Sequence, residues 1–309
     1  MRAMQVCLNI LMVLWLVATS GCSIQRLAVN RVGDALAAGG TTFAADDDPE
    51  LIKAAVPFSL KLMESLLDEN PRHAGLLFAT SSGFTQYTYA YVQQEADELE
   101  EKDFAAALRL RKRAGRLYLR ARNYGLRGLE LTHPGITKTL QKDARLAVQV
   151  LNKEDVPQAY WCALSWFAAI AVSKDNPDLI ADLPQAEALM DRALTLDERF
   201  EAGALHAFYI SYEFSRQGVA GDPLPRARAH YERALALSGG QQASPFVSWA
   251  EAVCVQQQDL DGFKAQLGLA LSIDVDAKPP WRLANLIMQR RARWLLSRTD
   301  ELFLPKPNK

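Results

Sequence analysis

The chain has 309 residues, of which 49% are hydrophobic and 23% are charged, with only 17 glycines and 14 prolines. A chain of this composition can bury a large core, and no alternation typical of strands competes with its helical periods. Its formal net charge is −1, and loss of residues 1–21, with one basic residue, leaves 34 basic (35 − 1) against 36 acidic residues, or −2. No bulk charge therefore indicates a nucleic-acid partner.

Residues 1–21 have the pattern of an export signal. Arg2 precedes an apolar run over residues 6–18, and small residues at 19–21 stand before Cys22. The run is too short for a permanent membrane span. Its end resembles a bacterial lipoprotein processing site, which predicts cleavage before Cys22 and acyl chains on that residue. An ordinary secretory signal is the alternative.

The cysteines agree with an exported protein. Cys7 leaves with the signal and Cys22 is acylated, so Cys162 and Cys254 remain in an oxidising compartment. Each lies in an apolar helical stretch, which favours two buried thiols, although a disulfide between them stays open. Ser23, rather than Asp, follows Cys22. In Gram-negative lipoproteins this implies the outer membrane, with the body facing the periplasm.

Residues 22–49 are expected to form the lipidated N-terminus and a tether, and residues 50–309 a helical domain. The first helix should cover residues 50–69, with Asp48 as its cap and an end before Pro71. Two further helices are predicted over residues 74–98, which are rich in aromatic side chains, and from Asp103 to about Glu130.

The helix from Asp103 has two faces. One face repeats by four and three residues and should meet the core. Its members are Leu110, Ala114, Leu117, Ala121 and Tyr124. Beside them runs a basic stripe, which we define as Arg109, Arg113, Arg116, Arg120 and Arg127. A solvated face is the simpler interpretation of this stripe. The alternative is contact with an acidic partner, an anionic ligand or lipid head groups, with Arg109, Arg113, Arg116 and Arg120 as the contact residues.

A repeated phrase organises the second half of the chain. In residues 186–198, small Ala186, larger Met190 and small Ala193 fall on one helical face, and the small residues let a neighbouring helix approach. The phrase returns 41 residues later at Ala227 and 36 residues after that at Phe263. Returns near the tetratricopeptide period of about 34 residues predict stacked helical hairpins, an all-α solenoid.

The hairpins become regular from Pro157. Residues 174–184 are expected to be a loop insertion. The next hairpins should pair residues 201–216 with 226–238, and 245–256 with 261–273. Prolines at 279 and 280 then break the chain, and residues 281–302 should form a capping helix that shields the last apolar face.

Residues 237–241 spell LSGGQ, which contacts ATP in ABC transporter ATPases. The chain has no G-x-x-x-x-G-K-[ST] loop, so we interpret Gly239 or Gly240 as a left-handed stop of the preceding helix. The four histidines show no metal-ligand spacing, and neither a nucleophile elbow nor a dinucleotide fingerprint occurs. We therefore predict no enzyme, cofactor or metal.

Several phrases together carry a family resemblance. They are TSSGFTQYTYAYVQQEAD (80–97), KRAGRLYLRARNYGLRGLE (112–130), EAGALHAFYIS (201–211), YERALALSGGQQASPFVSWAEAV (231–253) and WRLANLIMQRRARWLL (281–296). Behind a lipoprotein-type signal they resemble the TatT family, the T component of TRAP (tripartite ATP-independent periplasmic) transporters. The resemblance implies tetratricopeptide-like hairpins, a homotrimer, partnership with the periplasmic substrate-binding component, and a small, hydrophobic ligand. A scaffold that assembles envelope proteins without a ligand is the alternative, and hydrolase activity ranks last.

The repeat register places a ligand cleft. The first helices of tetratricopeptide repeats line the concave surface, and the register set by residues 194–198 turns particular side chains into it. These are Phe78, Tyr87, Trp166, Ile170, Leu205, Tyr209 and Tyr212. The competing interpretation is that these side chains fill the core between hairpins.

Overall fold

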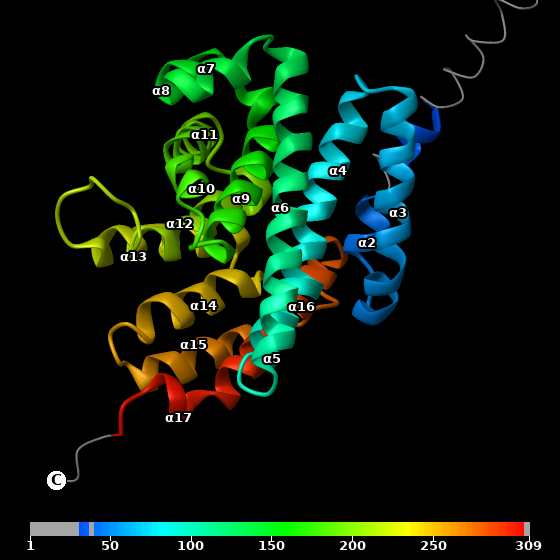
Figure 1. Cartoon of the computed structure of the whole chain (residues 1–309). Coiled ribbons are helices and arrows are strands. Elements are labelled where there is room, and N and C mark those ends of the chain that lie inside the picture. The colour runs from blue at the N-terminus through cyan, green and yellow to red at the C-terminus, as the bar shows by residue number, and fades with distance from the viewer. Residues whose placement is uncertain (1–30, 37–39, 306–309) are drawn as a thin grey trace, which may run out of the picture.

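The computed structural model describes residues 31–36 and 40–305, and every regular element in these ranges is a helix. The predicted all-α class is therefore confirmed, whereas the tetratricopeptide register stays a prediction. The long helix α6, Phe104–Thr132, runs through the middle of the molecule. The N-terminal helices lie on one side of it and the later hairpins on the other (Figure 1). Cys22 and the export signal lie outside the described residues.

The N-terminal helices follow the predicted boundaries closely. α3, Pro49–Glu69, begins at Asp48, whose carboxylate accepts the backbone N–H groups of Glu50 and Leu51 at 3.0 Å. The second predicted helix is continuous but changes geometry along its length. It consists of α4, Ala74–Tyr87, a π-helical segment, Thr88–Gln93, and α5, Gln94–Leu99.

Some of the stretch before α3 is also folded. Residues 31–36 are helical, and α2 covers Gly40–Ala44. Phe43 of α2 packs against the small core cluster of Ile52, Ala90, Tyr91 and Ile287. The chain is thus docked against the helical body before α3 begins.

Helix α6 and helix α9, Val156–Val172, pack closely because small residues face the contact. A Cβ atom on Gly125 would lie 2.7 Å from the Cβ atom of Cys162, which leaves no room for a side chain. Two short helices connect α6 to α9. These are α7, Ile136–Lys142, and α8, Ala144–Ala147.

The repeated phrase forms three helices, each with the predicted face buried. They are α11, Leu183–Leu196, α13, Pro223–Ser238, and α15, Leu260–Ser272. All of the small and large residues of the phrase except the partly buried Tyr231 are at most 1% exposed, namely Ala186, Met190, Ala193, Ala227, Ala234, Phe263, Leu267 and Ala270. Their spacing therefore identified real packing faces.

Helix α12 differs from its predicted span of residues 201–216, because it covers only Ala204–Tyr212. Glu201, Ala202 and Gly203 all have positive φ values of 44°, 55° and 96°. A Cβ atom on Gly203 would lie 3.2 Å from the Leu237 side chain. The chain therefore turns tightly against α13 before it becomes helical, and the apolar period alone does not reveal such a turn.

The predicted loop over residues 174–184 was wrong in one respect, since it contains the short helix α10, Pro177–Ala181. Asn176 caps this helix by accepting the backbone N–H of Leu179 at 3.1 Å. The next predicted helix, over residues 245–256, consists of α14, Ala243–Trp249, and a second π-helical segment, Ala250–Cys254.

The C-terminal helix does more than cover the last hairpin. It is formed by α16, Arg282–Ser297, and α17, Thr299–Leu302. Ala292 and Leu295 of α16 belong to the core of α14 and α15, as a capping helix requires. Its other side returns to the N-terminal helices, where Arg290 binds Glu98 at 2.7 Å and Arg291 binds Asp97 at 2.8 Å. The two ends of the helical array are thus joined.

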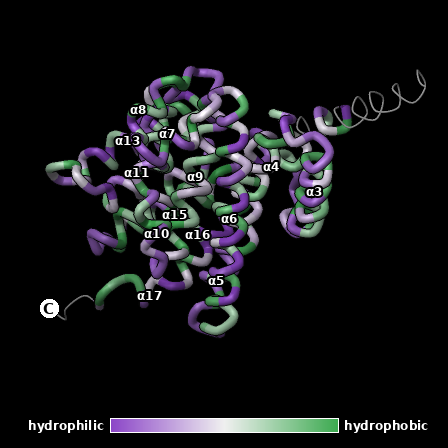
Figure 2. The backbone as a smooth tube through the Cα atoms, turned by 45° about the horizontal axis from the view of Figure 1, so that its top comes forward, coloured by the Kyte–Doolittle hydropathy of each residue, from purple (hydrophilic) through white to green (hydrophobic). Residues whose placement is uncertain are grey.

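Two large apolar clusters fill the body. The first lies mainly among α6, α9 and α11, and the second among α13, α14, α15 and α16. Apolar and polar residues alternate along most helices, as expected for helices that bury one face (Figure 2). Among the described residues, no helix is both long and apolar enough to cross a membrane.

Candidate functional site

Helix α12 lies where the two large clusters meet. Its Leu205, Tyr209 and Tyr212 belong to the first cluster, whereas Ile210 belongs to the second. We call this region the junction: the contact of the hairpin α9/α11 with the hairpin α12/α13. Close backbone packing across it is sparse compared with the packing of α6 on α9. Large side chains fill the space instead.

Aromatic rings form the apolar part of the junction. Phe167 of α9 lies with its ring centroid 4.8 Å from that of Phe208 and 4.7 Å from that of Tyr212. Phe208 also contacts Tyr209 at 5.2 Å and stacks on Tyr212 at 5.1 Å. One ring from the first hairpin therefore packs against two from the second, Phe208 and Tyr212.

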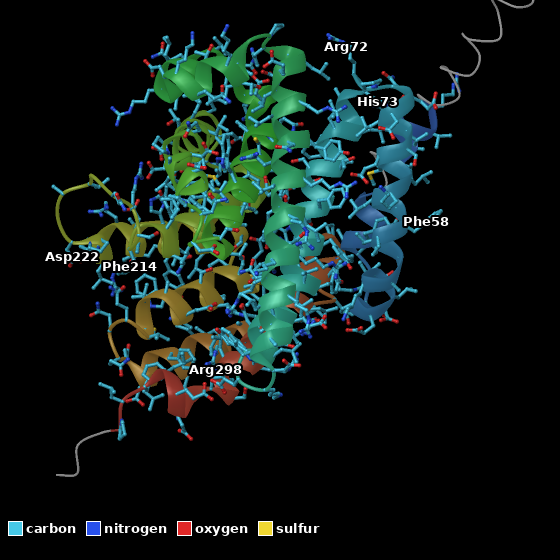
Figure 3. All side chains as sticks on the ribbon, in the orientation of Figure 1. Phe58, Arg72, His73, Phe214, Asp222 and Arg298 are labelled. Atoms are coloured by element: carbon cyan, nitrogen blue, oxygen red, sulfur yellow. The ribbon has the colours of Figure 1, made fainter. Side chains whose placement is uncertain are left out.

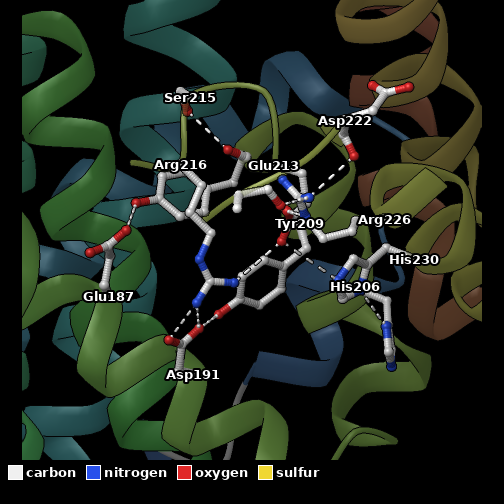
Figure 4. Close-up of polar contacts among 12 residues, drawn as sticks. Glu187, Asp191, His206, Tyr209, Glu213, Ser215, Arg216, Asp222, Arg226 and His230 are labelled. Carbon is white, nitrogen blue, oxygen red and sulfur yellow. Dashed lines mark hydrogen bonds and ion pairs between the residues drawn. The ribbon is translucent and has the colours of Figure 1, made fainter. Parts of the chain in front are cut away.

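The tyrosine hydroxyls connect this aromatic group to carboxylates on α11 (Figure 4). Tyr209 donates to Asp191 and Tyr212 donates to Glu187. Arg216 holds the same Asp191 with contacts of 2.6 and 2.8 Å. Burial, followed by the neighbouring carboxylates, raises the pKa of both tyrosines. Both hydroxyls therefore stay protonated and act as donors.

Glu213 is the most deeply buried charge of the junction, with 2% of its side chain exposed. Arg226 donates to it through Nε, and Arg216 through Nη1 at 3.3 Å. A buried carboxylate is tolerated only when it is paired in this way. The pair of arginines therefore ties the end of α12 to both the following loop and α13.

Two histidines meet beside Glu213. The Nδ1 atoms of His206 on α12 and His230 on α13 are 2.8 Å apart. His206 Nε2 lies 3.3 Å from Glu198, which Arg233 also binds. Burial lowers the pKa of His206, and burial together with His206 lowers the pKa of His230 to about 4. Both rings are therefore neutral at neutral pH.

Trp166 lies on the side of α9 that faces α6, away from α12. Its indole N–H donates to Asp182 at 3.3 Å, and the guanidinium of Arg122 lies 4.9 Å above its ring. Arg122 also pairs with Asp182 at 3.4 Å. This indole is 4% exposed, so it is part of a closed contact between α6, α9 and the start of α11.

The seven residues predicted to line a cleft belong to one region. All of them are members of the first cluster or pack against it. Leu205 and Tyr209 are at most 1% exposed, and Trp166 and Tyr212 are also buried. Phe78, Tyr87 and Ile170 are partly exposed. All seven thus lie in or against one cluster that extends from the N-terminal helices to α12, and the cleft itself stays a prediction.

The basic stripe divides into two groups. Arg120 binds the buried Glu64, and Arg127 donates to the backbone oxygen of Pro71 at 3.1 Å. Arg109, Arg113 and Arg116 are exposed and form no ion pair with another described residue. Phe104 and Leu108, 63% and 41% exposed, lie on the same helix. Only the first half of the stripe is therefore free to meet another molecule.

Other chemistry expected from the sequence has a structural explanation. Cys162 and Cys254 are free and buried, and burial raises their pKa to about 12 and about 11. Gly239 and Gly240 have φ values of 63° and 68°, and their N–H groups reach the backbone oxygen of Leu235. The LSGGQ glycines are thus a helix stop, as predicted.

A cavity of about 280 Å³ lies beside the LSGGQ turn. Its lining includes Gln241, Phe246, Leu269, Ile273 and Asp274. Within residues 31–36 and 40–305, no group of three or more His, Cys, Asp or Glu side chains is arranged around a metal position.

The fold and the junction define an all-helical protein built from packed hairpins. The sequence profile of the family described as TAtT, TRAP transporter T-component, matches residues 45–303. This chain therefore belongs to the TRAP transporter T-component family, and the resemblance identified from the sequence is confirmed. An uncharacterized protein of Treponema pallidum (strain Nichols) is 29% identical over 303 residues, covering 92% of this chain and 94% of that protein. The family is a transporter component and not a known enzyme family.

The sequence did not reveal the His206–His230 contact. The two residues are 24 positions apart, one on each helix of a hairpin, whereas familiar metal motifs place histidines three to five residues apart. Aligning the predicted hairpin partners, with α12 antiparallel to α13, would have been the only available signal.

Proposed function

We propose that this protein is a periplasm-facing component of a TRAP transport system that binds a small hydrophobic ligand at the junction. The supporting observation is that Leu205, Tyr209 and Tyr212 of the predicted cleft lie at this junction, a contact made by side chains rather than by close backbone packing. Opening this contact would require rotation of a few rings and release of the Tyr209–Asp191 and Tyr212–Glu187 hydrogen bonds. Apolar walls with a few fixed polar groups are the usual composition of a ligand site.

The partly exposed residues are the proposed entrance. Phe78 and Tyr87 on the N-terminal helical unit and Ile170 on α9 pack against the same cluster as Trp166 and Tyr209. A ligand that displaces Phe167 or Tyr212 would replace ring contacts with its own apolar surface. Such an exchange keeps buried area nearly constant, so its cost is small.

The test measures binding and stability in the same set of variants. N-phenyl-1-naphthylamine serves as the apolar probe, and native mass spectrometry detects any retained ligand. Ile170→Ala and Phe78→Ala should weaken probe binding at least tenfold and cost less stability than Tyr209→Ala, for which about 3 to 5 kcal/mol is expected. Phe263→Ala, in the second cluster, is the matched control for lost packing. Undiminished probe binding in both entrance variants would show that the ligand does not sit at the junction.

The free half of the basic stripe is the proposed contact with the periplasmic substrate-binding component. Arg109, Arg113 and Arg116 are exposed, whereas Arg120 is engaged with Glu64 and contributes only from the edge. Reversal of the three free arginines to Glu should lower the association rate, with a strong salt dependence. Equal association rates for the wild type and this variant at low salt would show that the stripe is only a solvated face.

Anchoring and assembly complete the proposal. Acyl chains on Cys22 would hold the protein at the outer membrane, and a fatty-acid probe should label the wild type but not Cys22→Ser. A homotrimer is expected from the resemblance and is tested by sedimentation. The alternative is a scaffold that carries no ligand, which the absence of any probe binding to the wild type would favour.

A further inference from the structure

The pair His206 and His230 imposes a specific arrangement of protons. Only one hydrogen atom fits between their Nδ1 atoms, which are 2.8 Å apart. His206 Nε2 faces the Glu198 carboxylate at 3.3 Å, so this nitrogen must carry a proton and His206 Nδ1 must accept. His230 Nδ1 is then the donor. That choice leaves His230 Nε2 without a proton, 4.0 Å from the carboxylate of Glu213.

The neutral arrangement is thus incomplete on one side. A bare nitrogen faces a carboxylate oxygen, and two electron-rich atoms repel each other. A cation between the two Nδ1 atoms removes the conflict, because His230 can then carry its proton on Nε2 and point it at Glu213. Both histidines would have the same arrangement, with Nδ1 on the cation and Nε2–H toward a carboxylate.

This arrangement is the one that proteins use to orient imidazole ligands. Metal-bound histidines almost always donate their second N–H to a carboxylate, a backbone oxygen or water. Glu198 and Glu213 occupy these two outer positions. Neither histidine can turn freely, since His206 is 8% exposed and the ring of His230 stacks on Tyr209 at 4.9 Å.

The charged groups around the two histidines are paired with one another. The carboxylates are Glu187 and Asp191 on α11, Glu198 before α12, and Glu213 after it. The guanidiniums are Arg216, Arg226 and Arg233 (Figure 4 shows all but Glu198 and Arg233). Glu187 accepts from Tyr212, and the other three carboxylates are matched by the three guanidiniums, so the charges around the two neutral rings balance.

We propose that His206 and His230 form a two-imidazole site for a divalent transition metal of the copper or nickel type, completed by water. Metal–nitrogen bonds of about 2.0 Å to atoms 2.8 Å apart subtend about 90°. That angle fits neighbouring corners of a square-planar or tetragonal site, the preference of Cu²⁺ and Ni²⁺, better than a tetrahedron. The bound ion would link α12 to α13 beside Tyr209, whose ring stacks on His230.

The experiment titrates the full mature protein, without a polyhistidine tag, with Cu²⁺. We expect one ion per chain and an electron paramagnetic resonance spectrum with hyperfine splitting from two nitrogen atoms. His230→Asn places an amide near the Nδ1 position and keeps a hydrogen bond to His206, so it should remain folded yet bind Cu²⁺ at least tenfold more weakly. His206→Asn should do the same.

Two further variants separate a built site from adventitious binding. Glu198→Gln removes the carboxylate that accepts the proton of His206 Nε2 but keeps both metal-binding nitrogen atoms. It should weaken Cu²⁺ binding tenfold or more. His133→Asn is the control. His133 lies outside this cluster and pairs with Asp155 at 2.8 Å, so its substitution should leave the affinity for Cu²⁺ unchanged. Binding that persists equally in His206→Asn and His230→Asn, or no stoichiometric binding by the wild type, would overturn the proposal.

Discussion

Substitution of Arg291 by Met tests how strongly the two ends of the molecule are joined. Arg291 is 8% exposed and holds both Asp97 of α5, at 2.8 Å, and Glu251 of the second π-helical segment. It also packs over the ring of Trp294, with its guanidinium carbon 4.2 Å from the centroid. Methionine keeps most of the chain length and removes the charge.

The expected loss of stability depends on the two carboxylates that lose their partner in Arg291→Met. Removing one member of a buried ion pair costs about 3 to 5 kcal/mol, because the partner stays buried without compensation. Here Glu251 is 40% exposed, and Asp97 keeps Arg111 at 3.5 Å, so both carboxylates are partly relieved. We therefore expect a loss of about 2 to 3 kcal/mol in the free energy of unfolding, measured by urea denaturation.

Arg298→Met is the matched control. Arg298 lies at the bottom of the molecule (Figure 3) and binds Glu101 and Glu301, two carboxylates that are 53% and 43% exposed. Loss of such surface pairs should cost about 0.2 to 1 kcal/mol. Hydrogen exchange should also rise in α5 for Arg291→Met and stay unchanged for the control. Equal, small losses in both variants would refute the idea that Arg291 closes the array.

Two further results are expected. His230 has its pKa lowered from 6.5 to about 4, so the unfolded chain binds its proton first and stability should fall as pH drops from about 6.5 to 4. After allowance for partial exposure, the loss is about 2 kcal/mol, and urea titrations in chelator-containing buffer should show a weaker pH dependence in His230→Asn. Gly125→Ala should lower the melting temperature and cost about 1 to 3 kcal/mol, because its Cβ would meet Cys162. Gly268→Ala, which meets nothing within 4 Å, should instead stabilise α15, and a lower melting temperature for it than for Gly125→Ala would contradict this reasoning.

Local patterns predicted most of the helices because the signals for each helix lie within its own segment of the sequence. Asp48 and Asp103 indicate helix starts through their capping side chains, and the period of the phrase that begins at Ala186 indicates a buried face. The turn at Glu201 to Gly203 was missed because only Gly203 opposes a helix there, while the positive φ values of Glu201 and Ala202 have no local signal. Its cause lies in the close approach of another helix, which no local pattern records.

The contents of the junction were predictable only in part. Repeat register selected Trp166, Tyr209 and Tyr212 as neighbours, and the structure places them in one cluster. Their hydroxyl and indole partners on α11 and before it were not predictable, since a carboxylate on a helix surface looks the same whether it is solvated or paired. The contact of Arg291 with Asp97 was equally unpredictable, because it joins residues 194 positions apart.

The π-helical segment Thr88–Gln93 has a consequence for how this chain tolerates changes in length. A π segment contains one residue more than the α-helix needs for the same turn. Deleting a single residue there would restore α geometry and leave the helical faces after it nearly unchanged, whereas the same deletion in α4 would rotate everything after it by about 100° around the helix axis. A one-residue deletion within Thr88–Gln93 should therefore keep Asp97 and Glu98 directed at α16, whereas a one-residue deletion in α4 would turn both carboxylates away from Arg290 and Arg291.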